Sequence, residues 1–278
     1  MERATRPGAE TAVASPRSMP LGRLLGVPLE VHWSFSLLLA LVAFTAAPRG
    51  AAAVAAGLAW VVALFACVVV HELAHCIVAR RKGATVRRIV LLPIGGVSQL
   101  EAMPEAPRDE FDVAAVGPLT SFVLAVALGV VAVAAGAHLW PPTLIAGNWW
   151  VRLAWLNALL AVFNVLPALP MDGGRMLRAT LARHRPRAQA TAAAARVARV
   201  IGSAMILVGI LFDFWLVLIG IFVVLGAAAE QGAALDADGA PRLPGGAHDP
   251  PSDEHARSSA PAVGAGPPEP YVRQGGTR

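Results

Sequence analysis

The chain alternates between long apolar runs and short polar segments. A helix of about 20 apolar residues crosses a bilayer, and a shorter run can do so when flanking residues extend it. The pattern therefore predicts a membrane all-α fold with six transmembrane helices, at about residues 33–47, 51–79, 117–137, 149–166, 200–212 and 214–229.

One segment between the second and third apolar runs has a different pattern. Residues 85–101 combine β-branched side chains with Pro93 and the pair Gly95-Gly96, which is typical of short strands and turns. Non-helical backbone is stable at membrane depth only where it is buried in protein or faces a wet cavity. The sequence predicts a small membrane-associated β-hairpin or sheet at this point.

Both ends of the chain are polar. Residues 1–20 lack the apolar core of a signal peptide, and residues 231–278 are rich in Pro, Gly and Ala with few aliphatic side chains. We therefore expect a polar N-terminal tail (1–20), one six-span membrane domain (21–230) and a disordered C-terminal tail (231–278).

The composition agrees with a polytopic membrane protein. Hydrophobic residues make up 56% of the chain and charged residues 15%. The net charge of +5 comes from Arg residues near the predicted helix ends. Such charges set membrane topology, so the basic balance does not indicate a nucleic-acid partner.

Loop charges predict an orientation. The N-terminus, the loops 80–88 and 175–199 and the C-terminal tail are rich in Arg, whereas the loops 48–50 and 138–148 are nearly free of basic residues. Because basic loops stay in the cytoplasm, we expect a multi-pass plasma-membrane protein with both termini cytoplasmic. The second and fourth spans then run in the same direction, and their C-terminal ends lie at the same depth.

The main chemical motif lies in the second apolar run, at His71-Glu72-Leu73-Ala74-His75. Residues four apart on a helix are separated by about 40° around its axis, so both imidazoles can reach one metal ion. Glu72 is placed to act on water at that ion rather than to bind it. Ionisable groups are costly in hydrocarbon, so this cluster indicates a functional site.

A catalytic zinc site usually has three protein ligands, so a third must come from elsewhere. Asp172, in the Pro- and Gly-rich segment after the fourth run, is our first choice, although an Asp is also common in turns. Cys67, one turn before His71, is the alternative, but such a cysteine is more often a core residue. Cys76 points away from the histidine face, and His32 fits an interfacial anchor better than a ligand.

Several motifs carry a family resemblance. The segments 71–75, 164–167 (Asn-Val-Leu-Pro) and 170–175 (Pro-Met-Asp-Gly-Gly-Arg) together resemble the site-2 protease family of intramembrane zinc metalloproteases, over about residues 20–230. Gly95-Gly96 and Gly117-Pro118, which we expect to open the third helix, also fit this family.

The resemblance implies one catalytic Zn²⁺ per chain with Glu72 as the general base. The implied zinc ligands are His71, His75 and Asp172. Many relatives carry a regulatory nucleotide-binding (CBS) or PDZ module, and we expect neither in this chain.

The resemblance also implies how a substrate is held. Asn164 matches an asparagine near the scissile carbonyl group, where it would bind the substrate or the oxyanion. The strand-like segment with Gly95, Gly96 and Val97 is a candidate for pairing with an unwound substrate.

The implied function is a zinc-dependent intramembrane endopeptidase, with a transmembrane protein substrate and the lipid bilayer as partners. The sequence gives no oligomeric state. Two other classes use the same residues: a membrane metal transporter or channel, and a proteolytically inactive membrane scaffold. The Glu next to the first His argues against transport, and the intact set of His, Glu and Asp argues against a scaffold.

Overall fold

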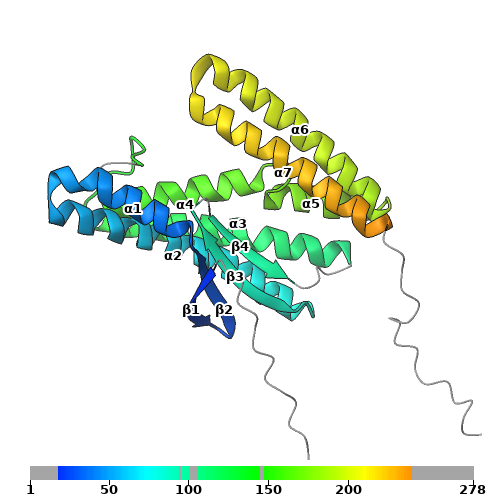
Figure 1. Cartoon of the computed structure of the whole chain (residues 1–278), viewed down its shortest axis with the longest axis horizontal. Helices are drawn as coiled ribbons and strands as arrows, with labels where there is room; N and C mark the ends of the chain where they lie inside the picture. Colours follow the sequence, from blue (N-terminus) through cyan, green and yellow to red (C-terminus); the bar gives the residue numbers. More distant parts are fainter. Residues whose placement is uncertain (1–17, 94, 101–105, 145–146, 240–278) are drawn as a thin grey trace, which may run out of the picture. The chain divides into compact units, whose positions relative to one another are not determined.

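The computed structural model describes residues 18–93, 95–100, 106–144 and 147–239 (Figure 1). This part of the chain forms seven α-helices, one short 3-10 helix and four strands. In chain order they are β1 (Ser18–Leu24), β2 (Val27–His32), α1 (Phe35–Ala46), η1 (Ala47–Arg49), α2 (Ala51–Arg81), β3 (Val86–Leu92), β4 (Gly95–Leu100), α3 (Pro107–Ala134), α4 (Trp149–Val165), α5 (Asp172–Leu181), α6 (Arg187–Phe212) and α7 (Phe214–Gly239).

The four strands form one sheet in the order β1-β2-β3-β4. The pairs β1–β2 and β3–β4 are antiparallel, and β2–β3 is parallel. β4 is therefore an edge strand, with β3 as its neighbour in the sheet. The buried side of the sheet packs against α1 and α2 through apolar side chains that include Val27, Phe65 and Ile89.

The predicted hairpin is confirmed by β3 and β4, but the sheet has four strands rather than two. β1 and β2 come from residues that we expected to be the end of a polar tail and a short lead-in to the first helix. Because β2 pairs in parallel with a distant strand, joining Leu29 to Ile89, no local pattern reveals the pairing. The rest of the predicted N-terminal tail, residues 1–17, lies outside the described residues.

Four helices are long and apolar enough to cross a membrane: α2, α3, α6 and the Phe214–Leu235 part of α7. The segment Phe35–Arg49 and the helix α4 are apolar but shorter. The structure thus supports a mainly helical membrane protein, whereas the prediction of six spans is not confirmed by helix length.

Helix boundaries differ from the apolar pattern at several points. α3 begins at Pro107, so Gly117-Pro118 lies inside this helix and does not open it, and α6 begins at Arg187, inside the predicted basic loop. Helical backbone bonds continue through polar residues that reach solvent or a partner, so an apolar run marks only part of a helix. α7 extends to Gly239, so the predicted tail 231–278 begins as helix, and residues 240–278 lie outside the described residues.

Ion pairs around the buried Glu110 and Arg178 connect four helices. Glu110 of α3 is 1% exposed, and Arg178 of α5 binds its carboxylate at 2.7 Å. Arg178 also reaches Glu230 of α7 at 2.9 Å, and Arg187 at the start of α6 lies 3.3 Å from Glu110. We refer to Glu110, Arg178, Arg187 and Glu230 as the ion cluster.

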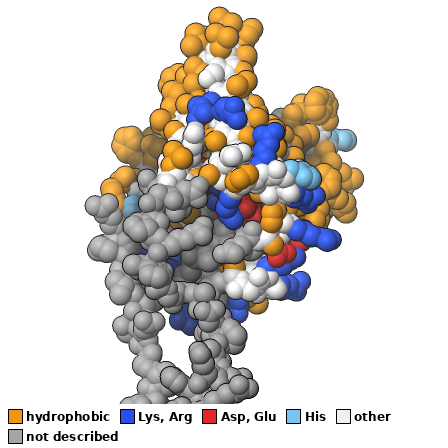
Figure 2. All heavy atoms as spheres, turned by 90° about the vertical axis from the view of Figure 1, so that its right-hand side faces the viewer, with side chains coloured by type: hydrophobic (Ala, Val, Ile, Leu, Met, Phe, Trp, Pro, Cys, Tyr) orange, Lys and Arg blue, Asp and Glu red, His pale blue; other side chains and the backbone are white. Residues whose placement is uncertain are grey.

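Glycines allow α6 and α7 to pack closely. A Cβ at Gly202 would lie 2.9 Å from the carbonyl oxygen of Gly220, and a Cβ at Gly209 would lie 2.6 Å from the Val217 nitrogen. Hydrophobic side chains cover the part of this pair that rises above the rest in Figure 2, and Lys and Arg side chains gather below it. An apolar outer surface of this kind matches a membrane-spanning helix pair.

Candidate metal and active site

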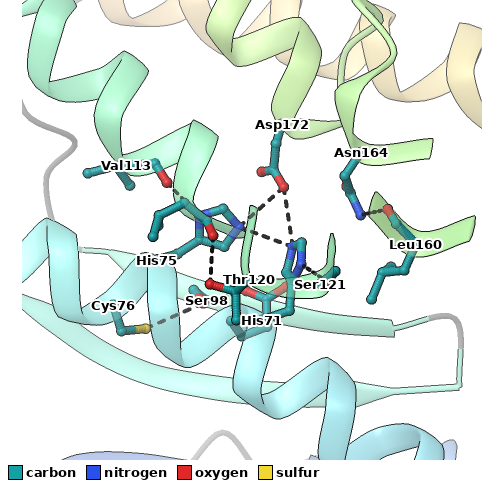
Figure 3. A network of polar contacts seen from close by, with 12 residues as sticks. His71, His75, Cys76, Ser98, Val113, Thr120, Ser121, Leu160, Asn164 and Asp172 are labelled. Atoms are coloured by element: carbon teal, nitrogen blue, oxygen red, sulfur yellow. Dashed lines mark hydrogen bonds and ion pairs between the residues drawn. The ribbon is translucent and has the colours of Figure 1, made fainter. Parts of the chain in front are cut away.

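Three predicted metal ligands converge between α2 and α5. The Nε2 atoms of His71 and His75 are 3.2 Å apart. The Asp172 Oδ2 atom lies 3.2 Å from Nε2 of His75 and 3.3 Å from Nε2 of His71 (Figure 3). All three residues are buried, with exposures of 3%, 7% and 8% for His71, His75 and Asp172. Among the described residues, they form the one group of His, Cys, Asp and Glu side chains close enough to share a metal ion.

The spacing of these three atoms fits zinc. Bonds of about 2.0–2.1 Å from zinc to nitrogen and oxygen, in tetrahedral geometry, place ligand atoms roughly 3.3–3.4 Å apart. The observed separations of 3.2 to 3.3 Å agree with that edge length. Two imidazoles and one carboxylate are also the donor set of many catalytic zinc sites.

Both histidines are oriented by α3 through their second ring nitrogen. His75 Nδ1 donates to the Val113 carbonyl oxygen at 2.6 Å, which leaves Nε2 as the nitrogen without a proton. His71 Nδ1 lies 2.8 Å from the Ser121 hydroxyl. Such partners fix the ring orientation and the tautomer of metal-binding histidines. The spacing of His71 and His75 in the sequence does not predict that Val113 and Ser121 contact their rings.

Gly117 of α3 leaves room for the two imidazoles. A Cβ at this position would lie 2.1 Å from Nε2 of His75 and 2.7 Å from Nε2 of His71. Distances this short do not occur between real atoms, so α3 can approach the metal-binding nitrogens only with Gly here. In the sequence, Gly117 was noted only as part of the family resemblance. The structure shows its physical role, which is to leave space for the two imidazole rings.

The turn between α4 and α5 positions Asp172 as the first residue of α5. A Cβ at Gly173 would lie 2.3 Å from the Leu166 carbonyl oxygen, and a Cβ at Gly174 would lie 2.3 Å from the Leu169 nitrogen. The two glycines therefore allow the turn to fold tightly back on itself, and this places the carboxylate next to α2.

The carboxyl of Asp172 is held in its charged form. Burial acts to raise its pKa, whereas hydrogen bonds from His71 and His75 act to lower it. The lowering prevails, so the pKa of Asp172 lies below its usual range. A charged carboxylate is the form that binds a metal cation.

Glu72 is held by strand β4. Its carboxylate accepts a hydrogen bond from the Ser98 hydroxyl at 2.5 Å. A Cβ at Gly96 would lie 2.7 Å from Glu72 Cγ, so this glycine lets the strand approach the helix. Cys76 is buried and donates to Ser98 at 3.5 Å. We did not predict Ser98, although it follows Gly96 by two residues and so lies on the same face of the strand.

One cavity brings the predicted site residues together. It has a volume of about 430 Å³, and we call it the catalytic cavity. Its walls contain the predicted residues His71, Glu72, His75, Gly95, Gly96, Val97, Asn164 and Asp172. Asn164 donates from Nδ2 to the Leu160 carbonyl oxygen at 3.0 Å. Arg175 and Phe222 also line the cavity and were not predicted.

The two rejected ligands lie elsewhere. Cys67 is a free cysteine that is not part of the described metal cluster. His32 Nδ1 lies 2.7 Å from the Ser34 hydroxyl, and its ring packs beside Trp33.

Asp213 lies in the short connection between α6 and α7, where its carboxylate accepts a hydrogen bond from the Trp215 backbone N–H.

Comparisons with known proteins agree with the geometry of the site. The profile of peptidase family M50 matches residues 59–141 and 137–209. The putative zinc metalloprotease Rip3 of Mycobacterium tuberculosis is 36% identical over 233 residues, which cover 77% of this chain and 58% of Rip3. The zinc metalloprotease MJ0392 of Methanocaldococcus jannaschii is 34% identical over 218 residues, 77% of this chain and 60% of MJ0392. The chain thus spans about three fifths of the length of these relatives.

A solved structure has a similar fold. The site-2 protease from Methanocaldococcus jannaschii matches with a TM-score of 0.57 and 33% sequence identity. The match covers 77% of this chain and 95% of that structure.

Proposed function

This chain belongs to the site-2 protease family, peptidase family M50, and from that membership we propose that it is a zinc-dependent intramembrane endopeptidase. Its substrates would be membrane proteins, cleaved within or near a transmembrane segment. The observation that carries the proposal is the buried cluster of His71, His75 and Asp172, which shares one cavity with Glu72.

The three ligands would hold one zinc ion per chain. A zinc ion in this position supplies Lewis-acid chemistry, which makes water a nucleophile near neutral pH and polarises a carbonyl group. Glu72 accepts a proton from the attacking water and passes it to the leaving amine nitrogen, as the carbon–nitrogen bond of the peptide breaks. The hydrogen bond from Ser98 restrains the Glu72 carboxylate beside strand β4.

Two features of the catalytic cavity support binding of an unwound peptide. Strand β4 is an edge strand, and Gly95, Gly96 and Val97 line the cavity. An edge strand offers backbone donors and acceptors that replace the hydrogen bonds of a substrate helix once it unwinds. Asn164 also lines the cavity, where its amide N–H would hold the carbonyl group of the scissile bond.

The proposed location is the plasma membrane, with both chain termini in the cytoplasm. Four long apolar helices support a multi-pass protein, and the Arg-rich loops support this orientation. The two shorter apolar helices, Phe35–Arg49 and α4, would complete six spans if the bilayer thins or flanking residues extend them.

Glu72→Gln tests the proposed reaction. The amide cannot accept the proton from water, so we expect cleavage of a panel of tagged single-span membrane substrates to fall at least about 100-fold. Metal analysis of purified protein should still show one zinc per chain, since Glu72 is not a ligand. Asp213→Asn, at the α6–α7 link, is the matched control and should cleave normally.

Two results would contradict the proposal. One is a Glu72→Gln variant that cleaves at the wild-type rate. The other is zinc-loaded wild-type protein that leaves the whole panel intact while a relative from the same family cuts it. The second result would favour a transporter or a scaffold.

A further inference from the structure

The catalytic cavity contains one positively charged side chain that the reaction does not use. Arg175 lies one helical turn after Asp172 on α5, and residues three apart lie on the same face of a helix. Among the described residues, Arg175 is the one Lys or Arg that lines this cavity. Its side chain is 35% exposed, so a molecule in the cavity can reach it.

The guanidinium group of Arg175 has unused hydrogen-bond donors. Its Nε atom is buried without a partner, so a ligand cannot reach that atom. The terminal nitrogens Nη1 and Nη2 remain solvent-accessible, and within the described residues neither makes a hydrogen bond. Their nearest ionic contact is with Glu230, whose Oε1 lies 3.9 Å from Nη2, beyond hydrogen-bond distance. The two terminal nitrogens are therefore available to a ligand.

The charges behind the cavity do not neutralise Arg175. The ion cluster is balanced by itself, because it contains two carboxylates and two guanidinium groups. Within it, Glu230 lies 2.9 Å from Arg178, closer than the 3.9 Å to Arg175. Arg175 is thus a cation in excess of the described carboxylates around it.

The other charges in the cavity wall do not neutralise Arg175 either. Glu72 and Asp172 are the remaining charged residues in the described wall. A bound zinc ion would balance these two negative charges, so Arg175 would leave the cavity with an excess of one positive charge. A charge in a partly dry site is costly until an opposite charge pairs with it. The cavity therefore favours an anionic group beside Arg175.

We propose that Arg175 binds the carboxylate of an acidic side chain in the substrate and so helps to determine which segments the site accepts. The inference rests on the proposed protease function and deepens it. A guanidinium group presents a planar fork of N–H donors that matches the two oxygens of a carboxylate. The carboxylate that hydrolysis creates forms at the metal, where zinc would bind it, so we assign a side-chain carboxylate to Arg175.

In the active protein, the preference should appear in KM. A substrate with Glu beside Arg175 should have a KM about 10-fold lower than the same substrate with Gln, because a hydrogen bond to a charged group is worth about this factor. We expect kcat to stay the same, since Arg175 does not act on the attacking water. Arg175→Gln should raise KM for the Glu substrate and leave KM for the Gln substrate unchanged.

Binding to Glu72→Gln protein tests the contact without cleavage. Zinc-loaded full-length Glu72→Gln protein in detergent is titrated with fluorescent single-span peptides. One Glu is moved through successive positions and compared with Gln at the same position. We expect a few positions at which the Glu peptide binds about 10-fold more tightly. Addition of Arg175→Gln should remove this difference, and such a double-mutant cycle assigns the carboxylate to Arg175.

Three matched measurements separate this contact from a structural effect. Arg175→Gln leaves the ion cluster balanced, so zinc content and the midpoint of thermal unfolding should not change. Arg185→Gln removes an exposed positive charge between α5 and α6 and should keep the full preference for Glu peptides. Arg175→Lys keeps the charge but not the planar fork, so it should retain part of the preference.

Two results would overturn the role of Arg175. One is equal binding of Glu and Gln peptides at every position, a result that needs no variant at Arg175. The other is a preference that persists in Arg175→Gln, and its loss on removal of zinc would assign the carboxylate to the metal instead. If zinc-loaded wild-type protein cleaves no substrate, the protease function fails, whereas an Arg175-dependent preference in the binding test still identifies a site for acidic segments.

Discussion

Gly117 provides no metal ligand, yet a side chain at this position would overlap the imidazole rings of His71 and His75. Gly117 faces the metal-binding nitrogens of His71 and His75, and it lies on the helix that also orients both rings through Val113 and Ser121. Any side chain at this position has to displace an imidazole. The metal site therefore depends on the absence of a Cβ as much as on the three ligands.

Gly117→Ala is expected to lose zinc. The added methyl group would lie within 2.1 Å of His75 Nε2, so the ring must rotate away from the metal position. Zinc content measured on purified protein should fall below about one tenth of the wild-type value, because misplaced ligands typically weaken metal binding 10- to 100-fold. Gly129→Ala in the same helix is the control, since its nearest neighbour would be 3.7 Å away. Equal zinc content in both variants would contradict the argument.

At the scale of residues, the sequence predicted the groups that we propose to carry the chemistry but not those that orient them. The spacing of His71, Glu72 and His75 is local to one helix, and Asp172 stands out in a turn rich in Pro and Gly. Ser98 and Ser121 are ordinary serines in the sequence. Their contacts to Glu72 and His71 arise from tertiary packing across 26 and 50 residues, which no local pattern reports. The catalytic roles of Glu72 and Asn164 stay predictions until they are measured.

At the scale of elements, α5 is short and carries the proposed metal ligand Asp172 at its first residue. The ion cluster holds this helix against its neighbours, because Arg178 contacts both Glu110 of α3 and Glu230 of α7. A buried ion pair gives little net stability, but removal of one partner leaves an uncompensated buried charge. The ion cluster therefore acts as the anchor of the helix that presents Asp172.

Arg178→Met is expected to destabilise the protein by about 3 kcal/mol, because the Glu110 carboxylate stays buried with only Arg187 as a partner. A lower midpoint of thermal unfolding in detergent would report this loss. The double variant Glu110→Met with Arg178→Met should recover much of it, since no unpaired charge is left. Arg196→Met, at an exposed position on α6, is the control. The interpretation is wrong if Arg178→Met unfolds at the same temperature as the control.

The elements themselves were only partly readable from the sequence. The β3–β4 hairpin has local signals, a turn with Pro93 and Gly95 between β-branched runs, and was predicted. β1 and β2 were missed because β2 is fixed by a parallel partner distant in sequence. The early starts of α3 and α6 were missed because their first turns are polar. Glu110 and Arg187 belong to the ion cluster, so helix formation there depends on tertiary partners.

At the scale of the whole molecule, the metal site joins two distant parts of the chain. His71 and His75 lie on α2, whereas Asp172 follows α4, and the α3 helix packs against both α2 and α5. A bound ion that interacts with the folded state and not with the unfolded chain adds to stability. Zinc should therefore stabilise the helical bundle as well as supply chemistry.

Removal of zinc by a chelator is expected to lower the thermal unfolding midpoint. Free zinc at about 1,000 times its dissociation constant adds about 4 kcal/mol to the stability of the folded state. Addition of zinc after dialysis should restore the original midpoint. A variant without two of the three proposed ligands, His71→Ala with His75→Ala, should unfold at the same temperature with and without chelator. A chelator that shifts both proteins equally would show that the effect is unrelated to this site.

The distance along the chain between the ligands also sets the time at which the site can form. His75 and Asp172 are separated by 97 residues. Ribosomes add about 5–20 residues per second, so roughly 5–20 seconds of synthesis pass between the two. During that interval the nascent chain contains His71 and His75 but not Asp172, so the proposed site is incomplete. The proposed three-ligand site can therefore form only after the start of α5 has been synthesised.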